Sequence, residues 1–364
     1  MSSVVFVSHT AALGGAELSL TRFLRATTNE SLGLVVLTPA SIDKWAVPDH
    51  VTVRQTKRTA TIRHTLSIAR ELRAILAELD PTVVVVNSYS AAQYVAVLPK
   101  RGRRNVFFLR QEALPLELTF LRKLFSRYFT LRRFDVFLAN SQWTASTLPS
   151  AISRHAQTIL MRPVSGVVAT HVKSPTHLAS RPLRLLSLSR LSPWKGIHVA
   201  IEALRLLKAR GYEDVELTIA GGDLFGEPGY ASSLRDSTSG LNVKFLGHQS
   251  DVSPLLTTHD VLLCLSKDPE PFGQVVIQGL AYGLVVIATD QGGPAETIHN
   301  GQDGILVSPE SPVEVAEAIR TLIDDPELVT SISAQANLAA RPYLDGETTA
   351  ALDKYLTDSV KTAE

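Results

Sequence analysis

The sequence predicts an α/β protein built from two doubly wound domains, and three observations point to this class. The chain has 364 residues, enough for about two domains of ordinary size. Short runs of β-branched residues alternate with stretches in which apolar residues recur at helical spacing. This alternation weakens between residues 165 and 182 and then starts again. We therefore expect one parallel sheet, covered by helices on both faces, in each half.

In the first half, the apolar run Val4–Ser8 is the first expected strand, and two glycines and a helical pattern follow it. A second helical pattern covers His64 to Leu79. Further strands are expected at Thr82–Val86, Val106–Leu109 and Val136–Ala139. Valine-rich runs of this kind are typical of strands buried on both faces.

The second half restarts after the expected linker at residues 165–182 with a strand at Leu183–Leu188 and a helix from about His198 to Arg210, which Gly211 ends. The other expected strands are Glu216–Ala220, Lys244–Leu246, Val261–Leu265 and Val285–Ala288. A further helix is expected from Ser311, with Ser311 as N-cap, Pro312 at the first helical position and Glu314 completing a capping box.

The formal charge of the chain is +1, which argues against a dedicated nucleic-acid binder. This total hides an asymmetry, because residues 1–180 hold 22 basic and 10 acidic residues and the remainder holds 14 and 25. The basic half predicts either an anionic partner or a surface dipole without function.

The single cysteine, Cys264, lies in an apolar run, so neither a disulfide framework nor a cysteine zinc site can form. We expect a buried structural thiol in a reducing compartment.

The N-terminus lacks the basic and long apolar regions of a signal peptide, and no stretch approaches the ~18 apolar residues of a membrane span. The sequence therefore predicts a cytoplasmic protein.

Glycines mark the ends of four expected strands, where ligands of parallel sheets bind. The four segments are His9–Glu17, Ser189–Gly196, Asp268–Gly283 and Gln291–Thr297. Glycines at such turns let backbone amides approach a ligand, and the following helix adds a positive dipole. Each segment alone is also compatible with an ordinary turn, but the four together favour a ligand site between the domains.

Two of these segments carry charged side chains. Arg190 and Lys195 follow the strand Leu183–Leu188, and a guanidinium with an ammonium suits a diphosphate; two solvated surface cations are the alternative. Glu270 lies on the loop before a helix that Gly273 opens, and that helix could receive a phosphate at its first amides. Gln278 falls on its second turn.

These motifs together resemble the retaining glycosyltransferases of family 4, which have the GT-B fold of two Rossmann-like domains facing each other across a cleft. The matching segments are Gly14-Gly15-Ala16-Glu17, Ser189-Arg190-Leu191 with Lys195-Gly196, Gly221-Gly222, Phe245-Leu246-Gly247, Glu270-Pro271-Phe272-Gly273 and Gly292-Gly293-Pro294-Ala295-Glu296. The resemblance implies an acceptor-binding domain at residues 1–170 and a nucleotide-sugar-binding domain at residues 180–340. It also implies that a C-terminal helix, at about 345–364, packs back onto the first domain.

The resemblance implies roles for individual residues. Arg190, Lys195 and Glu270 are implied as catalytic residues, the first two on the donor diphosphate and the third on the transferred sugar. Residues implied in donor binding are Gly14, Gly15, Gly247, His248, Phe272, Gly273, Gln274 and Gln278. The sequence departs from the family pattern at Gln278, where a second glutamate usually contacts the ribose. An amide oxygen can still accept that hydrogen bond, without charge assistance.

The implied reaction transfers a sugar from a nucleoside-diphosphate sugar to a glycan, lipid-linked or small-molecule acceptor, as in cell-surface polysaccharide biosynthesis. No metal site and no cofactor are expected, because cations and helix amides would stabilise the leaving diphosphate. Two alternatives remain open: a nucleotide-sugar 2-epimerase of similar fold and a non-catalytic glycosyltransferase-like partner subunit.

On the acceptor side, three residues follow strands of the first half and are candidates for acceptor binding: His9, Arg110 and Glu112. Structural roles are equally expected for them.

The basic stretches 100–104 and Arg122–Arg133 belong to the same half. Phe125, Tyr128, Phe129 and Leu131 interleave with the basic residues of the second stretch, which suits peripheral contact with an anionic membrane at the inner face. An ordinary basic helix with an apolar core face is the alternative.

Overall fold

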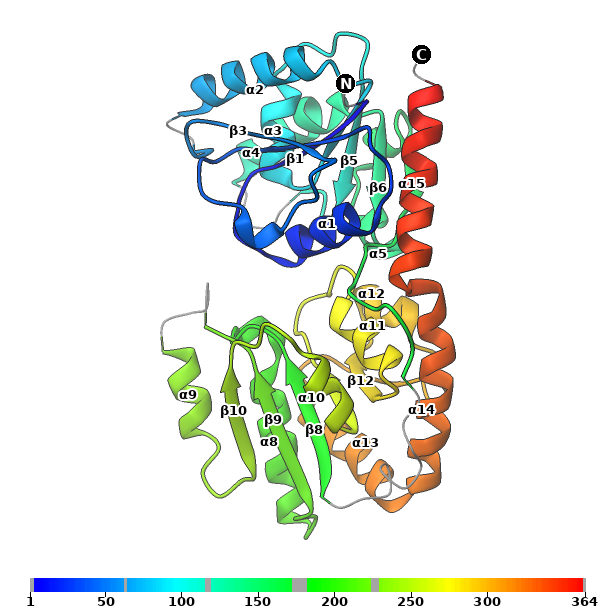
Figure 1. Cartoon of the computed structure of the whole chain (residues 1–364). Coiled ribbons are helices and arrows are strands. Elements are labelled where there is room, and N and C mark those ends of the chain that lie inside the picture. Colours follow the sequence, from blue (N-terminus) through cyan, green and yellow to red (C-terminus); the bar gives the residue numbers. More distant parts are fainter. Residues whose placement is uncertain (1–2, 62–63, 115–118, 172–181, 224–228, 363–364) are drawn as a thin grey trace. The chain divides into compact units, whose positions relative to one another are not determined.

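The computed structural model describes residues 3–61, 64–114, 119–171, 182–223 and 229–362, and most of the expected linker lies outside these ranges. The chain divides into two compact units, Met1–Gly166 with Tyr343–Glu364 and Val167–Pro342. Each unit contains one sheet whose strands are all parallel (Figure 1). The α/β class with two doubly wound domains is thereby confirmed.

The first unit has a seven-stranded sheet in the order β3-β2-β1-β4-β5-β6-β7. Its strands are β1 (Val4–Ser8), β2 (Leu32–Val36), β3 (Thr52–Gln55), β4 (Val83–Val86), β5 (Arg104–Leu109), β6 (Val136–Ala139) and β7 (Gln157–Leu160). The helices are α1 (Gly15–Ala26), α2 (Thr65–Leu79), α3 (Tyr89–Ala96), α4 (Phe120–Phe125), α5 (Gln142–Ser146), α6 (Ser150–Ser153) and α15 (Asp345–Lys361). The strand order runs outward from β1 in both directions, as in a doubly wound fold.

Two apolar layers cover this sheet, because alternate residues of each strand point to opposite faces. Val5, Val7 and their counterparts on β4 pack against α2 and α3. Val4 and Phe6 pack against α1 and α15, with Leu352 and Leu356 of α15 in that core. The C-terminal helix therefore completes the hydrophobic core of the first unit rather than that of the second.

The second unit has a six-stranded sheet in the order β10-β9-β8-β11-β12-β13. Its strands are β8 (Leu183–Leu188), β9 (Val215–Ala220), β10 (Val243–Gly247), β11 (Val261–Cys264), β12 (Val285–Thr289) and β13 (Ile305–Val307). The helices are α8 (Ile197–Ala209), α9 (Tyr230–Asp236), α10 (Ser253–Thr258), α11 (Gln274–Ala281), α12 (Gly292–Thr297), α13 (Pro312–Asp324) and α14 (Pro326–Ala340). One large cluster joins the sheet to α8 and α13.

The expected capping box at Ser311 is only half formed. The Ser311 hydroxyl accepts a hydrogen bond from the Glu314 amide, as an N-cap should. The Glu314 carboxylate, however, accepts from the Ser308 amide at 2.7 Å instead of from Ser311. The expectation was wrong only for the Glu314 carboxylate, because β13 ends just before the helix and brings the Ser308 amide within reach of it.

Candidate active site

Each sheet has a point at which its strand order reverses, between β1 and β4 in the first unit and between β8 and β11 in the second. The loops that follow the two strands at a reversal point run to opposite faces of the sheet. A crevice therefore opens between these loops at the carboxyl ends of the strands. In the second unit β8 and β11 pair only at Leu185 with Val261 and Leu186 with Leu262. Some of the expected site residues lie at these two reversal points, each within its own unit, whereas Arg110 and Glu112 follow β5 and His248 follows β10.

In the second unit, Lys195 and Glu270 form an ion pair with 2.6 Å between Nζ and Oε2. The same carboxylate oxygen accepts a hydrogen bond from the Ser266 hydroxyl at 2.8 Å. Both charged side chains are largely buried, with 15% and 16% of their surface exposed. The Lys195 ammonium also lies 3.9 Å from the centroid of the Trp194 ring. These contacts fix the position of a cation beside a carboxylate.

Gly196 makes this juxtaposition possible. Its φ is +68°, and a Cβ atom there would lie 1.8 Å from the carbonyl oxygen of Leu265. Only glycine allows the loop after β8 to touch the end of β11 so closely. The Lys267 amide donates to the Trp194 carbonyl at 2.7 Å and ties the two loops together.

The loop that carries Glu270 is held from its other side by the glycines that open α12. The Gly293 amide donates to the Glu270 carbonyl at 2.8 Å. Gly292 has φ +67°, and a Cβ atom there would lie 2.3 Å from that carbonyl oxygen. The fourth glycine-rich segment of the sequence therefore positions the third one.

Helix α11 begins at Gln274, shortly after Glu270 in the chain. Gly273 is its N-cap, with φ +82°, and Gln274 is the first helical residue. The first amides of a helix have no acceptor within the helix and carry its positive dipole end. Phe272 is buried, and Gln278 on the second turn is 8% exposed. The helix thus offers amide donors and a dipole next to Glu270.

Cys264 is the last residue of β11 and is partly rather than fully buried, close enough to Glu270 and Lys195 to interact with their charges. Burial raises the pKa of its thiol to about 12, and the neighbouring Glu270 carboxylate contributes to this rise. A thiol with so high a pKa stays protonated at neutral pH, and only a thiolate is a good nucleophile. Cys264 is therefore not a candidate nucleophile.

The structure leaves two expected site residues apart from this cluster. Arg190 follows β8 but is exposed, and among the described residues its guanidinium forms no ion pair. His248 is exposed after β10. Gly247, with φ +68°, accepts a hydrogen bond from the Gly221 amide at 2.8 Å. The loops after β9 and β10 are thus joined by a backbone hydrogen bond.

In the first unit, His9 follows β1 and lies against the loop after β4. Its Nδ1 is 2.8 Å from the hydroxyl of Ser88, which also caps α3 by accepting from the Ala91 amide. Burial lowers the pKa of His9. A neutral imidazole, able to donate at one nitrogen and accept at the other, is therefore favoured at pH 7.

Arg110 is held on three sides at the end of β5. Its guanidinium donates to Asn87 Oδ1 and to the Ser19 hydroxyl, each at 3.1 Å, and lies 3.6 Å from the centroid of the Phe108 ring. Burial lowers the pKa of Arg110, and the negative charge of Glu17 opposes this change. These contacts fix the orientation of the guanidinium.

Glu17 of the Gly14–Glu17 motif is 6% exposed. Burial raises the pKa of its carboxyl group, while backbone amides, Arg110 and Ser8 lower it. A Cβ atom on Gly14 would lie 2.9 Å from Glu17 Oε2, so the glycine makes room for the carboxylate. Gly15 begins α1. Glu112 is half-buried, and its side chain forms no hydrogen bond within the described part of the chain.

Four polar residues of these clusters were not predicted: Ser19, Asn87, Ser88 and Ser266. Asn87 and Ser88 come directly after the valine run of β4, and Ser266 comes just after β11. Polar residues that end apolar strands at the reversal point are the signal that could have identified these three. Ser19 lies inside α1, and nothing in its sequence context distinguishes it.

Within the described ranges, no group of three or more histidine, cysteine, aspartate or glutamate side chains is arranged to hold a metal ion. None of the helices described is both long and apolar enough to cross a membrane.

Two protein-family models match the chain. The model for glycosyl transferases group 1 matches residues 172–338. The model for glycosyltransferase family 4 matches residues 13–159. The first match contains the Lys195–Glu270 pair, and the second contains Gly14, Glu17 and Arg110.

The chain also resembles characterised glycosyltransferases. It is 28% identical to human alpha-1,3/1,6-mannosyltransferase ALG2 over 293 residues, which are 73% of this chain and 69% of the human protein. It is 33% identical to glycogen synthase of Mycobacterium tuberculosis over 150 residues, which are 40% of this chain and 35% of that enzyme. The chain thus spans about two thirds of the first relative and about a third of the second.

Solved structures share the whole architecture. The Anabaena protein Alr3699/HepE in complex with UDP superposes with a TM-score of 0.83 at 24% identity, covering 98% of this chain and 99% of that one. Sucrose-phosphate synthase from Thermosynechococcus elongatus gives 0.78 at 17% identity and covers 99% of both chains. The fold is therefore GT-B. The two family models, which match residues 13–159 and 172–338, support a glycosyltransferase of the family 4 type.

Proposed function

We propose that this protein is a retaining glycosyltransferase that moves a hexosyl group from a nucleoside-diphosphate sugar to a hydroxyl group of an acceptor. The observation that carries the proposal is the buried Lys195–Glu270–Ser266 cluster at the reversal point of the second sheet. The similar protein Alr3699/HepE has been solved in complex with UDP-glucose, which supports a nucleoside-diphosphate sugar as the donor.

In the proposed reaction, the bond between the anomeric carbon and the diphosphate oxygen breaks, and a bond to the acceptor oxygen forms on the same face of the sugar. The acceptor proton passes to the departing diphosphate oxygen, so no side-chain base is required. Arg190 and Lys195 would stabilise the negative charge that grows on the diphosphate, with the first amides of α11. Glu270 would accept hydrogen bonds from hydroxyls of the transferred sugar.

The test is release of free nucleoside diphosphate from a panel of nucleoside-diphosphate sugars, with and without candidate acceptor glycans, lipid-linked sugars and small alcohols. A transferase releases the diphosphate only when a suitable acceptor is present, and the anomeric configuration of the product reports retention. Epimerised donor without release would instead identify an epimerase. Neither release nor epimerisation with any donor would indicate a non-catalytic subunit.

We propose that the donor diphosphate is stabilised without a metal ion, because Arg190 and Lys195 supply two positive charges at the end of β8. Turnover should then be unchanged after treatment with EDTA and should not rise when Mg²⁺ or Mn²⁺ is added. Initial rates before and after chelation measure this. Loss of activity with EDTA and recovery with either ion would contradict the proposal.

We propose that Gln278 holds the donor ribose through its side-chain amide. Replacing it with alanine should raise the donor KM about three- to tenfold, since one neutral hydrogen bond contributes about 1 kcal/mol. Gln278→Glu should lower the KM by a similar factor because a charged acceptor binds a hydroxyl more strongly. Gln302→Ala, on an exposed turn, is the control. An unchanged donor KM in Gln278→Ala would show that this side chain does not bind the donor.

We propose that the first unit contacts an anionic membrane through an aromatic–basic patch. The patch consists of Phe120, Leu124, Phe125, Tyr128 and Phe129, which are 38–76% exposed, with Lys123, Arg127 and Arg132. Arg127 and Arg132 both lie about 6 Å from the Tyr128 ring. Leu131, expected in this surface, is fully buried in the core, so that part of the expectation was wrong. Exposed aromatics beside cations suit an interface rich in anionic lipids.

Sedimentation with vesicles tests this contact. Phosphatidylglycerol vesicles should pull down the protein at low salt, phosphatidylcholine vesicles should not, and salt should weaken the binding because the attraction is electrostatic. The double variant Phe120→Ser/Phe125→Ser should lose the binding. Leu66→Ser, which removes a side chain 75% exposed elsewhere in the same unit, is the matched control. Equal sedimentation of the double variant and the wild type would exclude the patch.

A further inference from the structure

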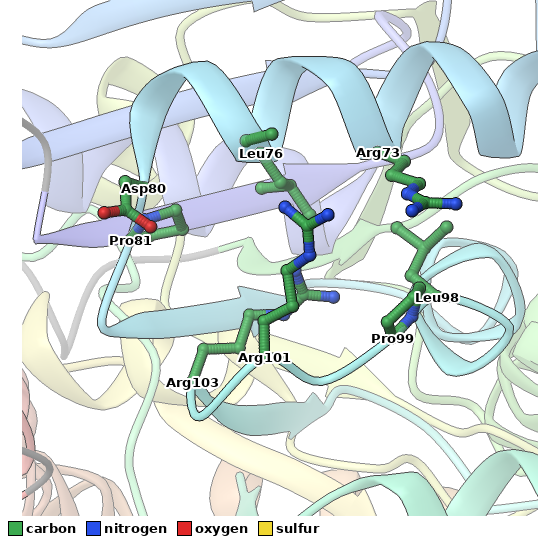
Figure 2. Close-up of a pocket in the computed structure, with 9 residues that line it drawn as sticks. Arg73, Leu76, Asp80, Pro81, Leu98, Pro99, Arg101 and Arg103 are labelled. Atoms are coloured by element: carbon green, nitrogen blue, oxygen red, sulfur yellow. The ribbon is translucent and has the colours of Figure 1, made fainter.

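A pocket lies at the amino-terminal ends of β4 and β5 in the first sheet, where these strands begin (Figure 2). The last turns of α2, the Asp80-Pro81 link into β4 and the residues 98–103 before β5 form its walls. The hollow between these residues measures about 370 Å³ when the open solvent at its mouth is included. Because the reversal-point site lies at the carboxyl ends of the strands, this pocket is not part of it.

Arg103 is the unusual residue of this pocket. It is 8% exposed, and its Nη2 is buried without a hydrogen-bond partner in the described structure. Its Nε donates to Asn105 Oδ1 at 3.3 Å. Burial lowers the pKa of Arg103, and the positive charges of Arg101 and Arg133 lower it further. A buried guanidinium surrounded by cations is costly unless an anion compensates it.

Two more guanidinium groups line the same pocket. Arg73 reaches it from α2 and Arg101 from the loop before β5, and Figure 2 shows the side chains of Arg101 and Arg103 side by side beneath α2. No carboxylate in the described ranges forms an ion pair with any of the three arginines. The one acidic residue of the lining, Asp80, lies at the end away from Arg73 (Figure 2).

We propose that this pocket binds a phosphoryl oxyanion, with Arg103 as its buried anchor and Arg73 and Arg101 closing over it. A guanidinium presents two parallel N–H donors that match the oxygens of a phosphate. The unpartnered Nη2 of Arg103 supplies a donor that gains its first acceptor when the anion binds. The ligand is either a soluble phosphate ester or the phosphomonoester headgroup of a lipid.

The residues of the basic stretch 100–104 therefore have different roles. Arg103 points into the pocket, whereas Lys100 pairs with Asp135 and Arg104 donates to the Thr362 hydroxyl at 3.1 Å. The stretch is therefore not a uniform solvated cationic surface. The inference does not depend on the transferase chemistry, since the pocket uses none of the residues proposed to bind donor or acceptor.

Calorimetric titration of the intact protein with inorganic phosphate tests the site, with sodium chloride at equal ionic strength as reference. We expect saturable binding and a rise in the melting temperature with phosphate concentration, because a ligand that binds only the folded state stabilises it. Arg103→Met should weaken phosphate binding at least tenfold. In phosphate-free buffer the same variant should melt no lower than the wild type, since it removes an uncompensated buried charge.

Further variants keep the test independent of the folding of Arg103→Met. Arg101→Met, at an exposed position, should also weaken phosphate binding, and Asp80→Asn should strengthen it by removing a negative charge. Asn also tolerates the left-handed backbone of residue 80, whose φ is +43°. Arg70→Met, on the same helix as Arg73 but outside the lining, should bind phosphate as the wild type does.

Vesicles containing phosphatidic acid distinguish the two sources of the oxyanion. Sedimentation with these vesicles that Arg103→Met weakens, while sedimentation with phosphatidylglycerol vesicles is unchanged, identifies the lipid headgroup. Calorimetric binding of phosphate without Arg103-dependent sedimentation identifies a soluble ester. Wild-type protein that binds no phosphate above the chloride reference, or Arg101 and Arg103 variants that bind phosphate as the wild type does, would overturn the proposal.

Discussion

Lys195→Ala is expected to lower kcat by roughly 10²- to 10³-fold, the usual loss when one donor to a developing oxyanion is removed. The reason is that Lys195 follows the end of β8, where the donor diphosphate is proposed to bind, and forms an ion pair with Glu270 there. Stopped or continuous assays of diphosphate release at saturating donor measure kcat. Lys195→Arg keeps the charge but not the compact ammonium geometry and should recover only part of the rate.

The matched control is Lys244→Ala, which removes a lysine that is 58% exposed and paired with Glu216 in the same unit. Its kcat should equal that of the wild type.

Arg190→Ala should lower kcat by a similar factor to Lys195→Ala. Because Arg190 is exposed, its loss should leave the melting temperature unchanged. Wild-type turnover in either alanine variant would remove that residue from the mechanism.

Gly196→Ala is expected to cause severe structural damage at the site, because Gly196 combines a left-handed backbone with a close approach to another loop. The new Cβ would lie 1.8 Å from the Leu265 carbonyl oxygen, so the loop after β8 would have to move away from β11. That movement would separate Lys195 from Glu270 and abolish activity. We expect a large drop in melting temperature together with loss of diphosphate release.

Gly211→Ala is the control for the backbone alone. Gly211 has φ +84°, like Gly196 in the left-handed region, but a Cβ atom there would meet nothing within 4 Å. Its substitution should cost only the ~1–2 kcal/mol of a left-handed residue and leave activity intact. Equal destabilisation of the two variants would show that the contact with Leu265 is not what requires glycine at position 196.

Strands with buried valine-rich runs were predicted well, because a strand covered on both faces must be apolar throughout. β1, β4 and β8 have nearly the predicted bounds. Four strands were not predicted: β2, β3, β7 and β13. β3 and β7 are half-buried or exposed at the two edges of the sheet and show no apolar run. β2, in contrast, is a fully buried apolar run that the same pattern could have identified. The glycosyltransferase family and the GT-B fold were also predicted, from motifs whose order and spacing are specific.

It was harder to predict from the sequence which side chains come together in a cluster. Arg110 and Glu17 were both visible as charged residues near strand ends, yet their shared surroundings depend on β1 and β5 flanking β4 in the sheet. The burial of Arg103 was also not predictable, because a stretch of four basic residues in five is typical of solvated surface. Such burial depends on which side of the loop faces α2.

The sequence by itself determined which residues form the strands, where each strand ends and which charged side chains follow those ends, because these properties are local. Only the tertiary structure decided that Lys195 meets Glu270, 75 residues further along the chain, and that Arg103 turns inward beneath α2. The physical reason is that such contacts depend on strand order and on close backbone approaches such as that of Gly196 to Leu265. Neither the order nor the approach is encoded in any single segment.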